Sequence, residues 1–187
     1  PVVIAQELNI DYAASSTDQF ISGELVEAAM TADAARVEPL GPLIMSIDVA
    51  RFGDNETVFA LRRGRVVHWL KAFRGLDTMM TVDRAKDEID SMPARPDQIA
   101  VDVIGVGAGV FDRLRQLYPG KVVAVNSSEK TEDGKNYNMR AKMWANFKDW
   151  LKDGPVVLPR DHTLKTQITG PKYRFRDNRL LMESKEE

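Results

Sequence analysis

The sequence contains no cysteine, only two histidines and no long hydrophobic run. Without cysteine, the chain can form no disulfide scaffold, no thiolate zinc site and no thiol nucleophile. The two histidines, His68 and His162, stand far apart and do not make a histidine-rich metal motif. No segment approaches the roughly 18 uncharged apolar residues of a membrane span, so no membrane partner is expected. Any metal that the chain binds should therefore be held by oxygen ligands.

The remaining composition is that of an ordinary globular protein. Of 187 residues, 43% are hydrophobic and 29% are charged, and the net charge is -2. The charge is unevenly distributed, because residues 121–180 hold thirteen basic and seven acidic side chains, a net +6. Such an excess suits a polyanion such as DNA. A solvated helical surface has the same composition, so charge alone does not decide between them.

Residues 1–40 differ in composition from the rest of the chain. They have weak periodicity, seven acids against one arginine, and a short helix candidate around residues 24–30. The segment ends at a Pro39-Leu40-Gly41-Pro42 breaker. We interpret residues 1–40 as a linker or remnant that follows a preceding domain. Since the first residue is Pro1, the sequence is expected to be a piece of a longer chain.

From residue 43 onward, apolar runs of strand length alternate with helix-period patterns. The sequence predicts strands over residues 43–49, 56–61, 65–73, 98–103 and 122–125. It predicts helices over residues 78–91 and 138–152, a helix after the glycine-rich segment 105–109, a short helix after Asp161, and a final hairpin around Asp177-Asn178. Strands joined by hairpins and followed by strand and helix alternation define an α/β fold with a mixed sheet.

Two aspartates, Asp48 and Asp102, each interrupt an otherwise apolar strand. An unpaired carboxylate is expensive to bury, so each is expected to have a compensating partner. If the two strands are parallel neighbours, about 4.8 Å apart, the carboxylates converge at the carboxyl ends of the strands. A hard divalent cation would satisfy both, and a pair of Mg²⁺ or Mn²⁺ ions would support phosphodiester cleavage. The competing interpretation is that each aspartate caps a turn or helix, which is the better explanation for either one alone.

Two glycine-containing segments are candidates for phosphate-binding sites. Residues 105–109 (GVGAG) lack the full G-x-G-x-x-G order, and we interpret them as a sharp turn with a close backbone approach to the acidic site. Gly120-Lys121 is followed by Val122 rather than by Ser or Thr, so a P-loop is absent. The sequence therefore predicts no ATP hydrolysis by that route.

Three motifs resemble the nuclease domain of large terminase subunits, the genome-packaging motors of tailed bacteriophages. Residues 46–57 (SIDVARFGDNET) look like the first acidic motif of that family, and residues 100–110 (AVDVIGVGAGV) resemble its second. Residues 138–144 (NMRAKMW) are similar to a later Asn/Arg helix start. The resemblance extends from about residue 41 to the end.

The resemblance implies a ribonuclease H-like fold, a mixed five-stranded sheet flanked by helices with an additional carboxyl-terminal hairpin. It implies an endonuclease over residues 41–187 that cuts concatemeric double-stranded DNA with two Mg²⁺ or Mn²⁺ ions. Asp48 and Asp102 would be the catalytic metal ligands, and Arg140 and Lys142 would contact phosphate. The implied partners are double-stranded DNA, the ATPase domain of the same polypeptide, the portal and the small terminase subunit, in the cytoplasm of the infected bacterium.

The sequence departs from the family's pattern in its third metal-binding aspartate. In the family this residue lies in a helix after the last hairpin, and residues 183–187 (ESKEE) resemble only the lead-in to it. We therefore expect the third ligand beyond Glu187, and the chain is expected to be truncated and weakly active or inactive. Asp177, in the hairpin turn, is a poor replacement, and Glu186 or Glu187 could at best approach the site.

Two other function classes stay open. An actin-like nucleotide-binding domain would share the architecture, but it needs a glycine-rich phosphate turn between its first two strands, where the sequence offers only Gly53. A non-catalytic DNA-binding or motor-coupling module would not need the third acid. Metal-dependent plasmid cleavage separates the nuclease from both, and nucleotide binding identifies the actin-like class.

Overall fold

The computed structural model describes residues 19–50 and 55–183. The chain divides into two compact units. One unit comprises residues 38–127, and the other combines the segment before residue 38 with the segment from residue 128 onward. No helix in the described part of the chain is long and apolar enough to cross a membrane.

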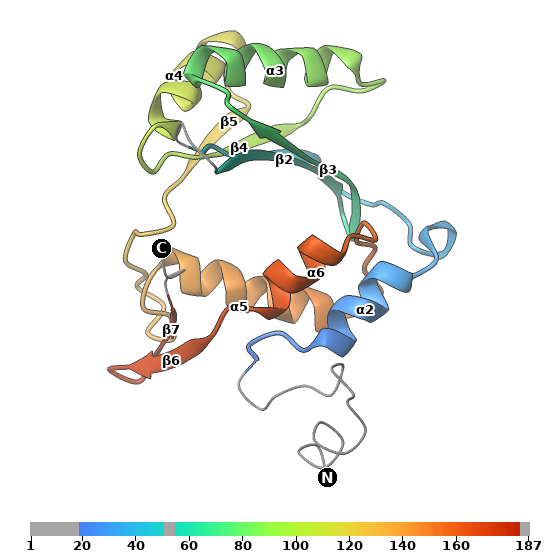
Figure 1. The fold of residues 1–187 in the computed structure, drawn as a ribbon, viewed down its shortest axis with the longest axis vertical. Helices are drawn as coiled ribbons and strands as arrows, with labels where there is room; N and C mark the ends of the chain where they lie inside the picture. The colour runs from blue at the N-terminus through green and yellow to red at the C-terminus, as the bar shows by residue number, and fades with distance from the viewer. Residues whose placement is uncertain (1–18, 51–54, 184–187) are drawn as a thin grey trace. The chain divides into compact units, whose positions relative to one another are not determined.

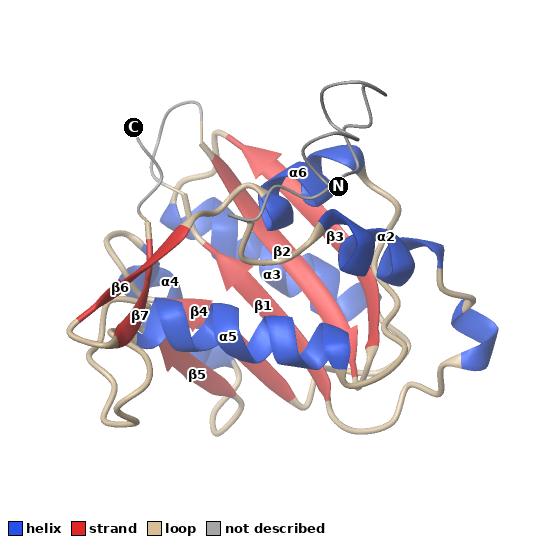
Figure 2. Cartoon of the chain, turned by 90° about the horizontal axis from the view of Figure 1, so that it is seen from below, coloured by secondary structure: helices blue, strands red, loops and turns tan. Residues whose placement is uncertain are grey.

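The unit of residues 38–127 is built on a five-stranded mixed sheet (Figures 1 and 2). The strand order is β3-β2-β1-β4-β5, with β1 antiparallel to β2 and parallel to β4. These strands are β1 (Leu43–Asp48), β2 (Glu56–Arg63), β3 (Val66–Arg74), β4 (Gln98–Asp102) and β5 (Val122–Val125). The predicted mixed sheet is confirmed, and the two strands that carry Asp48 and Asp102 are its central parallel pair.

Two helices cover one face of this sheet: α3 (Thr78–Ser91) and α4 (Gly107–Leu117) (Figure 1). Asp77 caps the start of α3, because its Oδ1 accepts a hydrogen bond from the Met80 N–H at 2.7 Å. Inward-facing residues of the strands and helices form one apolar core, which includes Met45, Ile47, Phe59, Ile89, Val101 and Leu114. The core thus lies between the sheet and the two helices, and every second side chain of each central strand points into it.

The turn between β2 and β3 differs slightly from the sequence prediction. β2 extends through Arg63, and the turn lies at Gly64 and Arg65. Gly64 has φ +54°, and a Cβ there would collide with the backbone of Leu40. Glycine is required at this position for both reasons.

Among its described residues, the other unit contains three α-helices and a hairpin. They are α2 (Gly23–Thr31), α5 (Met139–Lys152), α6 (His162–Thr169), β6 (Tyr173–Arg176) and β7 (Arg179–Met182), with a 3-10 turn over Ala34–Arg36. Side chains from the end of the chain hold α2: Lys165 pairs with Glu27 at 2.6 Å, and Arg160 Nε donates to the Met30 carbonyl at 2.9 Å. Helix α2 therefore packs within this unit (Figure 1).

The carboxyl-terminal hairpin is confirmed as predicted. Asp177 and Asn178 have φ values of +52° and +58°, so both central turn residues are left-handed. This is the geometry of a type I′ turn, which Asp and Asn tolerate better than other non-glycine residues.

Candidate metal centre

Asp48 and Asp102 are the last residues of the two central parallel strands, β1 and β4. The register pairs Ile44 with Gln98 and runs in step to Ile47 with Val101. The next residue on each strand is an aspartate, so Asp48 and Asp102 stand side by side at the strand ends. Neighbouring strands lie about 4.8 Å apart, and ligands of open α/β sheets bind outside this end. The parallel arrangement on which the sequence argument depended is therefore present.

Both carboxylates lie on the face of the sheet opposite α3 and α4. Their strand neighbours on the helix side, Ile47 and Val101, are buried at 2% and 0% exposure. Since side chains alternate along a strand, the aspartates point to the other face. Asp48 is exposed and Asp102 is partly exposed. The expectation that the two carboxylates are buried is therefore wrong, because the strand alternation keeps them out of the core.

The turn after β4 is shaped around Asp102. Its Oδ1 accepts a hydrogen bond from the Ile104 N–H at 3.0 Å, and Gly105 follows with φ +66°. Gly107, the first residue of α4, leaves no room for a side chain, because a Cβ there would overlap the Asp102 carbonyl oxygen. The interpretation of residues 105–109 as a sharp turn with close backbone approach is confirmed.

Gly107→Ala is expected to destabilise the protein by about 1–3 kcal/mol, because the added methyl must push the start of α4 away from Asp102. Urea unfolding followed by circular dichroism measures this change. Gly23→Ala is the matched control, since nothing lies within 4 Å of a Cβ at Gly23. An unchanged unfolding midpoint for Gly107→Ala would contradict the close approach.

A residue without an assigned role in the sequence analysis, Thr57, supports the end of β1. Thr57 is 2% exposed, and its hydroxyl oxygen accepts a hydrogen bond from the Ala50 N–H at 3.1 Å. Ala50 lies two residues after Asp48, so the contact ties the segment that leaves the candidate site to β2. A buried hydroxyl normally has a hydrogen-bond partner. That rule, applied to a threonine within a buried strand pattern, is the signal that could have identified it.

Thr57→Val is expected to lower the free energy of unfolding by about 1–2 kcal/mol, because it preserves shape but leaves the Ala50 N–H without this acceptor. It should also reduce any cleavage activity, since the segment after Asp48 loses its anchor. Thr57→Ser keeps the hydroxyl and should retain activity. If Thr57→Val unfolds and cleaves like the parent, Thr57 is not a positioning residue.

The donor set at the strand ends fits a hard divalent cation in part. Two carboxylates at the same edge of a sheet are the ligands that Mg²⁺ and Mn²⁺ take. Across residues 19–50 and 55–183, however, no three histidine, cysteine, aspartate or glutamate side chains form a metal-binding group. Two protein ligands leave such an ion mostly hydrated. The described residues by themselves therefore do not make a complete site for such an ion.

The other acids considered from the sequence lie either in the other unit or outside the described residues. Asp177 is in the β6–β7 turn, which belongs to the other unit. Glu186, Glu187 and residues 51–54 of the first acidic motif lie outside the described residues.

Arg140 and Lys142, predicted to contact phosphate, are in the first turn of α5, in the unit that does not hold the aspartates. The helix begins at the Asn-containing motif as the resemblance implied, and Asn138 caps it: its Oδ1 accepts a hydrogen bond from the Ala141 N–H at 3.0 Å. Arg140 Nη2 donates to the Glu183 carbonyl at 3.4 Å, whereas its buried Nε has no partner among the described residues. Lys142 Nζ lies 3.6 Å from Asp133 Oδ2.

Neither the known protein-family models nor curated protein sequences match the chain. Several solved structures match the chain. The chain is similar to the nuclease domain of the large terminase subunit gp2 of bacterial virus Sf6, with a TM-score of 0.72 and 19% identity over 89% of this chain and 88% of that chain. A mutant of that domain with manganese and beta-thujaplicinol gives a TM-score of 0.71 and 19% identity, over 88% and 87% of the two chains.

A second terminase nuclease, from the thermophilic phage G20c, was solved with bound magnesium. It matches with a TM-score of 0.64 and 17% identity, over 92% of this chain and 90% of that chain. At these identities the similarity establishes the fold. The predicted ribonuclease H-like fold class is thus confirmed: this chain has the fold of the nuclease domains of phage large terminase subunits.

Proposed function

We propose that the chain is a metal-dependent endonuclease domain of a viral DNA-packaging motor, which cuts concatemeric double-stranded phage DNA. The observation that carries this proposal is the β1–β4 register, which sets Asp48 beside Asp102 on one face of the sheet. The similarity of the fold to phage terminase nucleases supports it, since two of those structures contain manganese or magnesium.

In this proposal, Asp48 and Asp102 hold Mg²⁺ or Mn²⁺. When a pair of such ions is bound at these carboxylates, the chemistry they would supply is activation of a water and stabilisation of the leaving oxygen of a phosphodiester. The role of this chain's carboxylates is to be fixed in direction toward the ions. For Asp102 this is done by the Ile104 N–H and the turn packed on Gly107. The third ligand is proposed to lie beyond Glu187.

The partners follow from the same proposal. The substrate is double-stranded DNA, and the domain would work with the ATPase domain of its own polypeptide, the portal and the small terminase subunit. Its place of action would be the cytoplasm of the infected bacterium.

Arg140 and Lys142 are proposed to contact DNA phosphates, in the segment with the net charge of +6. Binding should weaken steeply with salt and depend little on sequence, because phosphate contacts release counterions without reading bases. Arg140→Ala should reduce the slope of log affinity against log salt by about 1. Filter binding of two unrelated duplexes over a salt series measures this. A salt-independent affinity or a strong preference for one duplex would count against the assignment.

The proposed activity is tested by incubating supercoiled plasmid with the 187-residue chain and with a chain extended through the expected third aspartate. We expect Mn²⁺-dependent nicking that EDTA abolishes, slow for the shorter chain and faster for the extended one. A protein that binds DNA but does not cut in either form would instead be a non-catalytic DNA-binding or coupling module. Equal rates for the two forms would show that the third ligand does not lie beyond Glu187.

A further inference from the structure

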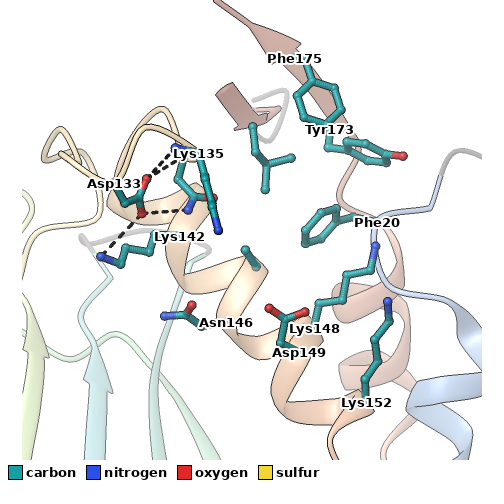
Figure 3. A pocket seen from close by; sticks show the side chains of 13 residues that line it. Phe20, Asp133, Lys135, Lys142, Asn146, Lys148, Asp149, Lys152, Tyr173 and Phe175 are labelled. Carbon is teal, nitrogen blue, oxygen red and sulfur yellow. Dashed lines mark hydrogen bonds and ion pairs between the residues drawn. The ribbon is translucent and has the colours of Figure 1, made fainter. Parts of the chain in front are cut away.

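The unit that contains α5 has a pocket unrelated to the aspartate pair. It has a volume of about 740 Å³ and is lined by α5, by residues 133–136 and by the β6–β7 hairpin (Figure 3). This volume falls within the range that is typical of small-molecule binding sites. Neither Asp48 nor Asp102 lines it.

One wall of the pocket is aromatic. The rings of Phe20 and Tyr173 meet edge to face at 5.2 Å, and those of Tyr173 and Phe175 meet at 6.1 Å with an interplanar angle of 84°. Figure 3 shows the three rings together on one side of the pocket. Phe175 is 68% exposed, so its ring adds little to the core. An exposed aromatic ring beside two others offers a flat surface on which another ring can stack.

Lysines from α5 adjoin this wall. Lys148 Nζ lies 4.4 Å from the centre of the Phe20 ring, and Lys152 follows one turn later on the same side of the helix. Burial lowers the pKa of Lys148, and the positive charge of Lys152 lowers it further. An anion bound between the two ammonium groups would remove that repulsion.

Two aspartates, Asp133 and Asp149, also line the pocket, and the charge of Asp149 acts on Lys148 in the opposite direction to that of Lys152. Asp133 is held within its own loop, where it accepts hydrogen bonds from the Lys135 and Asn136 N–H groups and from the Asn136 side chain. These bonds keep the pKa of Asp133 well below its usual range. The lining as a whole has four lysines against two aspartates, so the pocket is positive on balance.

We propose that this pocket binds a short stretch of single-stranded DNA, with a base stacked on Phe175 and a phosphate between Lys148 and Lys152. Stacking rings beside a line of basic side chains are the two features by which proteins hold single strands without reading sequence. A duplex keeps its bases stacked inside and cannot offer one to the wall. The proposal adds a DNA contact to the proposed nuclease, but it needs neither metal nor cleavage.

The test measures binding of a fluorescently labelled oligothymidylate by anisotropy in EDTA, so that failure of the metal-centre proposal does not affect the result. Phe175→Ala and Lys148→Gln should each weaken binding about tenfold, and Phe175→Tyr should restore most of it. Lys86→Gln is the matched control: it removes one lysine charge from α3, in the other unit, where Lys86 pairs with Asp90 at 2.9 Å.

Three results would overturn the proposal. The first is unchanged binding by Phe175→Ala and Lys148→Gln, with circular dichroism showing that both are folded. The second is an equal loss in Lys86→Gln, which would mean that only net charge matters. The third is competition by free thymidine monophosphate near the concentration at which the oligonucleotide binds, which would make this a mononucleotide pocket.

Discussion

In a chain extended through the expected third aspartate, Asp48→Asn and Asp102→Asn are each expected to reduce Mn²⁺-dependent plasmid cleavage by roughly 10²–10³-fold. A metal ligand at a reacting phosphate contributes several kcal/mol of transition-state stabilisation, and each ~1.4 kcal/mol is a factor of ten in rate. Asparagine keeps the size and shape of the side chain but removes the negative charge that holds the ion. The loss should therefore come without loss of the fold.

The matched control for these variants is Asp112→Asn. Asp112 lies on α4 in the same unit, is 65% exposed, and faces Arg115 at 3.9 Å. Its replacement should leave cleavage unchanged. Both site variants should unfold at the parental urea concentration or slightly above it, because one of two neighbouring like charges is removed. Parental cleavage by either site variant would refute the site assignment.

Phe59→Ala is expected to have the largest effect on stability, a loss of about 3–5 kcal/mol. Phe59 is fully buried, and its ring meets that of Phe73 edge to face at 5.2 Å. It lies opposite Ile47 on β1, and Ile47 is the residue directly before Asp48. Truncation therefore opens a cavity in the layer that supports the candidate site. Urea unfolding followed by circular dichroism measures the change.

Phe175→Ala makes the same truncation at a site that is 68% exposed and should change stability by less than about 0.5 kcal/mol. Phe59→Leu, which keeps most of the apolar volume, should fall between the two. Similar unfolding midpoints for Phe59→Ala and Phe175→Ala would contradict the assignment of the core.

Much of the sheet could be predicted from sequence because the signals are local. The apolar runs that became β1 and β4, the Asp77 cap of α3 and the Asp177-Asn178 turn each depend on a few neighbouring residues. The sequence does not predict that β1 pairs with β4. The paired residues are 54 positions apart, and nothing local in the sequence indicates that they are neighbours.

Other features depend on distant partners. Helix α2 is only nine residues long, and its ion pair joins Glu27 to Lys165, 138 positions further along the chain. The sequence predicts the helix over residues 138–152 but not which of its sides is covered: Met143 is 43% exposed, whereas Ala141 is buried. Periodicity indicates which residues share a face, and tertiary packing decides which face is covered.

The most direct test of the central claim is a Mn²⁺ titration followed by the electron paramagnetic resonance signal of the free ion, with the parent chain and both site variants. The account predicts weak binding by the parent that is lost in Asp48→Asn and equally in Asp102→Asn, because the two carboxylates share one site. Parental binding by both variants would contradict it.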